Sequence, residues 1–291
     1  MSPDIQRICE VIELWLSTRL DAAQSAWVSE RKNVIQSGDK KALFLAFGMT
    51  PRKVGKADLA LTNDEIMLSA SVRPHWNPEG WSIDQLVRVL FVLSYPSQDA
   101  NAYVAILDQL FSTGEVGELV ALYQALPLLP NPASHVMRAA EGIRTNIKAV
   151  FCAVAHHNPF PAEQFNDDQW NQMVLKCQFI LVPMSPIFGL DRRANAPLAT
   201  MVCDFIHERW AAKRPVAPEM WRCVGRFADA RALADLKHVL TTGTQVEKQA
   251  AALALSECPS PEAKQILDSD PYLALKVAHG TIDWDSIDES N

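Results

Sequence analysis

Glycine is scarce in this chain, with 11 among 291 residues. All-β folds need glycine for their many tight turns, so its scarcity favours helices. The alternation of apolar and polar residues that marks a half-buried strand is hard to find anywhere in the sequence. We therefore expect an all-α fold.

Long hydrophobic runs are also missing. The N-terminal stretch MSPDIQRICEVIELWLSTRL is interrupted by Asp4, Arg7 and Glu10, which argues against a signal peptide or a membrane span there. The apolar stretch VLKCQFILVPMSPIFGL is broken by Pro183 and Pro186. We expect a soluble, cytoplasmic protein with no direct membrane span.

An excess of positive charge is absent, because the formal net charge is -7. Such a chain repels the phosphates that a nucleic-acid binder must neutralise, so we expect no nucleic-acid partner. Gly55-Lys56 in TPRKVGK resembles the end of a phosphate loop. However, Thr50 replaces the first motif glycine and Ala57 lacks the magnesium-binding hydroxyl. We expect no nucleotide and no other cofactor.

The six cysteines form no CxxC pair. They are scattered through mostly apolar surroundings, at positions 9, 152, 177, 203, 223 and 258. This pattern is typical of reduced core thiols and argues against a disulfide framework or a zinc ribbon.

Helix starts are marked by a capping side chain followed by proline. This code occurs at Ser2-Pro3, Asn131-Pro132, Ser260-Pro261 and Asp270-Pro271. Apolar residues also recur at helical spacing. Together these signals predict helices at about 3–36, 39–47, 82–94, 99–112, 115–126, 133–157 with a break, 167–181, 192–213, 217–226, 229–241, 245–256 and 260–268.

The predicted helices suggest an irregular array with HEAT-like helix pairs toward the C-terminus. Residues 1–227 would form one helical domain, in which 48–81 mix glycine, proline and charge too irregularly for a single long helix and read as a connector. Residues 228–280 contain amphipathic helices around a Thr-Thr-Gly-Thr turn, which indicates HEAT-like repeats packed on that domain. Residues 281–291 form an acidic tail.

Two adjacent histidines, His156 and His157, precede the first proline of NPFP. Adjacent residues on a helix diverge by about 100°, so the two imidazoles do not ligate one ion together. A helix terminus favours a positively charged imidazole. We interpret the pair as a helix terminus, with His157 partly buried and His156 exposed.

The segment CDFIHERW carries Cys203, Asp204 and His207 on one helical face. His207-Glu208 begins like the zinc-protease motif HExxH, but Ala211 stands where the second histidine is needed. A hydrogen bond from Asp204 to His207 inside a packed helix is the more economical interpretation. We expect no metal site here.

Polar residues are dense from 141 to 226. Such groups either bond neighbouring helices to one another or line a cleft in which tryptophan supplies flat apolar walls and Asn and Arg orient a ligand. Both interpretations remain open from the sequence.

This region carries a family resemblance. The motifs NPFPAEQF, WNQMVLK, GLD-RAN and HERWAA-R occur in the order and with the separations of the EboA family of bacterial proteins, which the sequence resembles best over about residues 80–227. The resemblance implies a candidate ligand-binding site at the motif positions Arg144, Asn146, Asn158, Trp170, Asn171, Asp191, Arg193, His207, Glu208 and Trp210.

The resemblance also implies a role and partners. Family members are encoded beside a prenyltransferase-like membrane protein and enzyme-like partners, in clusters linked to traffic of secondary metabolites or their precursors toward the periplasm. We expect a non-enzymatic cytosolic accessory protein that binds a metabolite or a protein of the same gene cluster, associated with the inner membrane through a partner. No catalytic residue is assigned.

Two alternatives stay open. One is an enzyme, metal-assisted, acting on an anionic or prenylated small molecule. It would use His207 with Glu208 or Asp204, and an arginine at 192 or 193 to hold an anionic group. The other is a pure protein-interaction scaffold without a small-molecule pocket.

Overall fold

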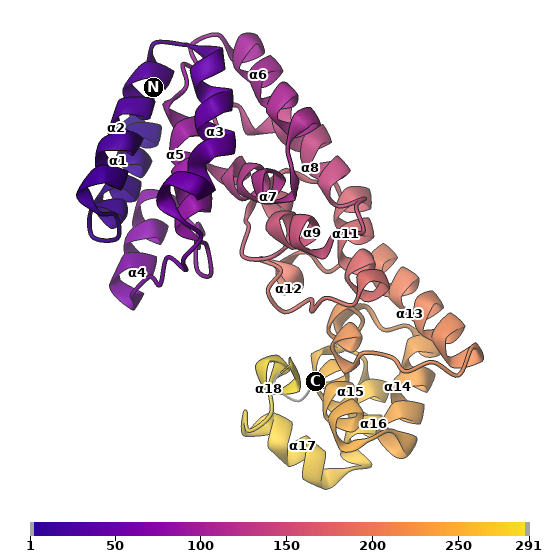
Figure 1. Cartoon of the computed structure of the whole chain (residues 1–291). Helices are drawn as coiled ribbons and strands as arrows, with labels where there is room; N and C mark the ends of the chain where they lie inside the picture. Colours follow the sequence, from indigo (N-terminus) through magenta and orange to yellow (C-terminus); the bar gives the residue numbers. More distant parts are fainter. Residues whose placement is uncertain (1–2, 289–291) are drawn as a thin grey trace. The chain divides into compact units, whose positions relative to one another are not determined.

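The computed structural model describes residues 3–288, and the elements of this range are helices (Figure 1). No strand occurs in it, although one isolated antiparallel bridge joins Asp58 and Ser82. The all-α prediction is therefore confirmed. None of the helices in the described range combines the length and the apolar character needed to cross a membrane.

The chain divides into two compact units, Met1–Asn166 and Asp167–Asn291. The sequence suggested a boundary after residue 227. In the structure, the helices beyond residue 228 share a compact unit with those from Asp167 onward.

The first unit is a set of mostly short helices. Its elements are α1 (Pro3–Ser17), α2 (Ala22–Gln36), α3 (Lys40–Val54), α4 (Asn63–Val72), α5 (Ile83–Ser94), α6 (Ala100–Thr113), α7 (Val116–Ala125), the 3-10 helices η1 (Leu126–Leu128) and η2 (Pro132–His135), α8 (Val136–Gly142), α9 (Lys148–Ala155) and α10 (Phe160–Gln164).

The second unit is also helical. Its elements are α11 (Asp167–Ile180), α12 (Leu190–Arg193), α13 (Ala196–Ala211), the 3-10 helices η3 (Pro218–Cys223) and η4 (Gly225–Phe227), α14 (Ala230–Thr242), α15 (Gln245–Glu257), α16 (Pro261–Asp268), α17 (Pro271–Ala278) and α18 (Trp284–Asp288). Helices α14 and α15 pack on each other as a pair. The HEAT-like character of this pair stays a prediction.

Helix α5 is the centre of the first unit. All of its residues except Gln85 are buried, and Leu86, Val87, Leu90 and Phe91 are completely buried. A helix that is buried on every side lies in the interior. Helices α1, α2, α3 and α7 all pack against it.

The expected irregular connector at 48–81 is wrong at its start, because α3 continues through Pro51 to Val54. Proline has no N–H, so the carbonyl of Phe47 loses its usual helical donor. Arg88 of α5 supplies one instead, since its Nε donates to Phe47 O at 3.0 Å. The replacement bond lets the helix run past the proline.

The same stretch contains α4, which the sequence analysis also missed. Thr62 and Glu65 form a capping box: the Thr62 N–H donates to Glu65 Oε2 at 2.9 Å, and the Glu65 N–H donates to Thr62 Oγ1 at 3.3 Å. A threonine and a glutamate at this spacing are the sequence pattern of a capping box, so the start of this helix could have been predicted.

The single helix expected at 3–36 is two helices. Asp21 accepts from the Gln24 N–H at 2.8 Å, and Gln24 Oε1 accepts from the Asp21 N–H at 2.9 Å. This capping box starts α2 and separates it from α1. Asn195 similarly interrupts the helix expected at 192–213, because its Oδ1 accepts from the Leu198 N–H at 2.9 Å and starts α13.

The stretch 281–291, predicted to be an acidic tail, contains the helix α18. Within it α18 is anchored by Ile287, which is completely buried, and by Trp284, whose Nε1 donates to Glu257 Oε1 of α15 at 2.7 Å. The apolar Ile and Trp outweigh the acidic neighbours here. Residues 289–291 lie outside the described residues.

Candidate functional site

Three of the predicted site residues belong to the first unit. Arg144 and Asn146 are exposed in the segment between α8 and α9, where the break expected in 133–157 occurs. Asn158 is buried. Its Nδ2 donates to Tyr123 O at 3.1 Å and to Ala153 O at 2.9 Å, and its Oδ1 accepts from the Phe160 N–H. The Asn158 amide therefore ties the end of α9 to α7.

The two histidines lie at the end of α9, as predicted. The helix stops at Ala155, and the His156 N–H donates to Cys152 O at 2.8 Å. The expected exposures are reversed, because His156 is half-buried and His157 is exposed. His157 has φ 51°, a left-handed conformation that turns the chain away from the helix earlier than expected.

In the second unit, two residues of the family motifs join α11 to the start of α13. Asn171 Nδ2 donates to Asn195 Oδ1 at 3.1 Å, and Asn195 Nδ2 donates to Asn171 Oδ1 at 2.8 Å. Because Asn195 also caps α13, this reciprocal amide pair fixes both the start of the helix and its neighbour. We call it the Asn171–Asn195 pair.

Trp170 and Arg193 pack beside this pair. Trp170 is completely buried, and the Arg193 guanidinium lies 4.8 Å from its ring centroid. The same guanidinium forms an ion pair with Asp167, with Nη2 2.7 Å from Oδ1. The cation–π contact and the ion pair together hold α12 against the first turn of α11.

Asp191 is bound by an arginine. Its Oδ1 accepts from Arg222 Nε at 2.6 Å and its Oδ2 accepts from Arg222 Nη2 at 2.8 Å. This bidentate geometry matches the fork of the guanidinium to the carboxylate. It ties α12 to η3.

His207 bridges α13 and α14, but not as the sequence suggested. Its Nε2 lies 2.7 Å from Asp235 Oδ2, and its Nδ1 lies 3.0 Å from Arg231 Nη2. Asp204 contacts Arg231 at 2.7 Å rather than His207, because the long arginine side chain of α14 reaches between them. The predicted Asp204–His207 hydrogen bond is therefore wrong.

These contacts fix the tautomer of His207. A guanidinium only donates hydrogen bonds, so Nδ1 is the acceptor and Nε2 carries the proton that is donated to Asp235. The imidazole also stacks on Trp210, with ring centroids 5.6 Å apart. Trp210 in turn contacts His238 and Trp221, and Glu208 is exposed.

The predicted residues thus fall into separate groups. Within the second unit, one group links α11, α12, α13 and η3, and another links α13 and α14. Among residues 3–288, no group of three or more His, Cys, Asp or Glu is arranged to hold a metal ion. Ligand binding by these residues stays a prediction.

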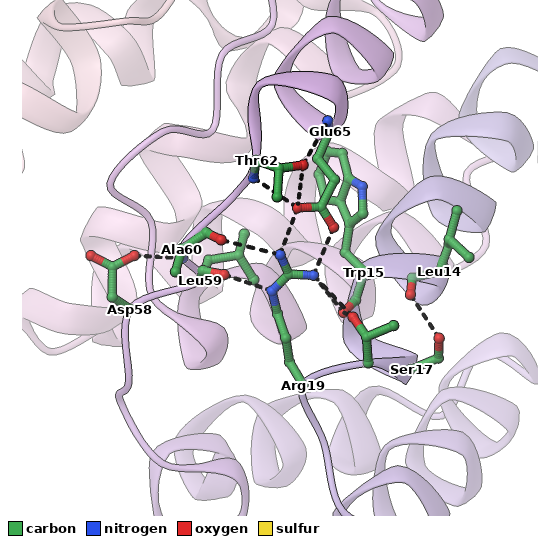
Figure 2. Close-up of polar contacts among 10 residues, drawn as sticks. Leu14, Trp15, Ser17, Arg19, Asp58, Leu59, Ala60, Thr62 and Glu65 are labelled. Carbon is green, nitrogen blue, oxygen red and sulfur yellow. Dashed lines mark hydrogen bonds and ion pairs between the residues drawn. The ribbon is translucent and has the colours of Figure 1, made fainter.

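Sequence reasoning missed Arg19, which holds the loop before α4 on the end of α1 (Figure 2). Its Nε donates to Leu59 O at 2.6 Å, and its Nη1 donates to Trp15 O at 3.0 Å. Nη1 and Nη2 also donate to Glu65 Oε1 and Oε2 at 2.9 and 2.7 Å. The hydrogen bond from Arg19 lowers the pKa of Glu65 to about 2. The capping-box spacing pointed to Glu65, but nothing local pointed to Arg19.

A cleft of about 360 Å³ lies between α1 and α2, which we call the α1–α2 cleft. Both helices pack on α5 more extensively than on each other, so a gap remains above α5. The cleft is lined by Glu13, Leu16, Ser17 and Leu20 of α1 and the turn after it, by Ser25, Val28, Ser29, Lys32 and Asn33 of α2, and by Leu90 of α5.

A second, more apolar groove of about 580 Å³ lies among α15, α16 and α17. Leu255, Leu267 and Val277 contribute to its lining.

The fold and these contacts define the class of the protein: it is all-α, and most of its candidate site residues connect one helix to another. The α1–α2 cleft stays open. The family follows from comparison with known proteins. A family model described as metabolite traffic protein EboA matches residues 8–225, so the chain belongs to the EboA family. Comparison with curated proteins and with solved structures gave no match.

Proposed function

We propose that this EboA-family chain is a non-enzymatic accessory protein that binds a metabolite or a protein partner during metabolite traffic. The observation that supports it most is the use made of the polar side chains. Asn158, Asn171, Asp191 and Arg193 all bond to groups on neighbouring helices. Groups engaged in this way position helices and are not poised to make or break bonds.

The proposal extends to partners and location, on the ground of the family resemblance. We place the protein with others of its gene cluster, including a prenyltransferase-like membrane protein, at the cytoplasmic side of the inner membrane. Crosslinking in cells that express the cluster tests this part directly.

An enzyme is the competing function, and one observation favours it. The His207–Asp235 contact is the kind of pair that orients a general base, and the imidazole is partly exposed. A base, however, needs a free nitrogen lone pair. The Nδ1 lone pair of His207 accepts from Arg231, and Nε2 carries the proton. The arrangement suits a link between α13 and α14 better than proton abstraction.

Native mass spectrometry distinguishes these functions. The purified full chain is incubated with a small-molecule extract of the bacterium that encodes it, separated from unbound compounds by gel filtration, and weighed before and after denaturation. We expect one retained compound for each chain, released with the mass that it has in the extract.

Two other outcomes contradict the proposal, and a third selects one of its two forms. A released compound that is chemically altered, with the alteration lost in a folded His207→Ala variant, would establish an enzyme. If no compound were retained here and no protein of the gene cluster were captured in the crosslinking experiment, the accessory role would be rejected. Crosslinking to a protein of the gene cluster without any retained compound would select the protein-binding form.

A further inference from the structure

The α1–α2 cleft has a polar lining where two consecutive helices would ordinarily pack. On α2 the lining residues recur three and four positions apart, which is one face of a helix: Ser25, Val28, Ser29, Lys32 and Asn33. Apolar side chains at this spacing would close the gap by packing on α1. Serine and asparagine do not favour such packing, because burying their polar groups without partners is costly.

The floor of the cleft is apolar. Leu16, Val28 and Leu90 line it and are buried within the unit. Ser25 and Ser29 of α2 line the cleft beside this floor and contribute hydroxyl groups to it. The lining of the cleft therefore combines aliphatic side chains, which include the half-buried Leu20, with hydrogen-bonding groups.

The charges of the cleft are already balanced. Lys32 Nζ pairs with Glu13 Oε1, which joins α2 to α1 across the cleft. A charged ligand that paired with either group would compete with its present partner, and it would gain little because both side chains are also in contact with water. An uncharged ligand leaves the pair intact.

We propose that the α1–α2 cleft binds an uncharged small molecule that has an aliphatic part and several hydroxyl groups. This inference rests on the proposed metabolite-binding function and names its site and ligand class. The volume of about 360 Å³ lies in the range of small-molecule pockets. The lining residues all fall within the 8–225 match to the family, whereas the lining of the α15–α17 groove lies beyond it.

Hexyl β-D-glucoside is a suitable probe, because it joins a short aliphatic chain to a hydroxylated ring and is uncharged. The full chain is labelled at leucine and valine methyl groups and titrated with the probe by NMR. We expect saturable shifts at Leu16, Leu20, Val28 and Leu90, with Kd of about 1 mM or tighter. Methyl groups of Leu255 in the α15–α17 groove should not move.

A substitution that fills the cleft tests whether the probe binds there. Ser29→Phe places a ring over the floor and should weaken binding at least tenfold. Ser112→Phe, at an exposed serine of α6, is the matched control and should bind like the parent. Both positions are exposed, so both variants should fold, which thermal unfolding checks. Equal binding by the two variants, or shifts centred outside the cleft, would overturn the inference.

The charge argument has its own test with hexylammonium and hexanoate ions. Both should bind the parent at least tenfold more weakly than the glucoside. In Lys32→Met the Glu13 carboxylate is left uncompensated, so hexylammonium binding should rise at least tenfold while hexanoate binding does not. Equal binding of all three probes to the parent would reject the ligand class.

One result distinguishes failure of this inference from failure of the proposed function. A metabolite from the extract that is retained equally by Ser29→Phe and Ser112→Phe leaves the accessory role standing and rejects the cleft as its site.

Discussion

Two interfaces between helices in this protein are lined by polar residues, and we call them seams. One is closed by hydrogen bonds and the other stays open. In the second unit, the Asn171–Asn195 pair closes the seam between α11 and α13, because each amide is donor and acceptor to the other. In the first unit, the seam between α1 and α2 carries serines and Asn33 and stays open as a cleft of about 360 Å³. Polar composition alone therefore does not identify a binding site. What separates the two seams is the kind of contact that crosses them: two amides bond reciprocally between α11 and α13, whereas the partly exposed Lys32–Glu13 ion pair spans the cleft between α1 and α2.

Helix α5, which contributes Leu90 to the floor of the cleft, also carries a buried ion pair. Arg88 and Asp84 of α5 form an ion pair, with Nη1 2.8 Å from Oδ2, and both side chains are only 5% exposed. Burial lowers the pKa of Arg88, and the Asp84 charge opposes this effect. Arg88 also holds the carbonyl of Phe47 that Pro51 leaves without a helical donor.

The largest effect should come from breaking this pair. Arg88→Met leaves the Asp84 carboxylate buried without its counter-charge and the Phe47 carbonyl without a donor, which should cost about 3 to 5 kcal/mol. Urea unfolding measures it. The double variant Asp84→Leu with Arg88→Met is the control, and it should recover much of the loss because no charge stays buried. A single variant as stable as the parent would show that this pair does not hold α5 under the cleft.

The two seams can be compared directly by the same change at one asparagine in each. Asn195→Ala removes the cap of α13 and leaves the buried Asn171 amide without its partner, so it should destabilise the protein by about 2 to 3 kcal/mol. Asn33→Ala on the rim of the cleft should change stability by less than about 0.5 kcal/mol. Urea unfolding of both variants gives the comparison. Equal losses would mean that the cleft is as closed as the other seam.

Local sequence signals predicted many of the helices and many of their caps. Ser260 accepts from the Glu262 N–H and Asp270 from the Leu273 N–H, as the cap-proline code indicates. Asn131 is an exception: it has φ 55° and makes no side-chain capping bond. The cap is a contact within one turn, so the sequence usually contains both partners side by side.

The partners of His207 and Asp191 could not be predicted in this way. Arg231, Asp235 and Arg222 are 24, 28 and 31 residues from the groups that they contact. Which of many arginines and aspartates meets a given side chain depends on how two helices are rotated against each other, which local patterns do not fix. The serines of α2 could not be predicted as cleft residues either, since the polar face of a helix that lines a cleft has the same sequence pattern as an ordinary solvent-exposed face.

A smaller loss than for Arg88 or Asn195 is expected at the Arg19–Glu65 ion pair, which joins the end of α1, beside the cleft, to α4. Glu65 has a folded pKa of about 2, below its ordinary value of 4.5, because Arg19 hydrogen-bonds to it. A depressed carboxyl pKa stabilises the folded state above the unfolded pKa, and this contribution is lost as the pH falls from about 4.5 to about 2. Glu65→Gln should therefore cost about 1 kcal/mol at neutral pH and should flatten the fall in stability across that window. Unfolding of parent and variant between about pH 2 and pH 7 measures both effects. If the two proteins lost stability in parallel on acidification, protonation of Glu65 would not be the cause of the loss. The contact between Arg19 and Glu65 would then not make the end of α1 sensitive to acid.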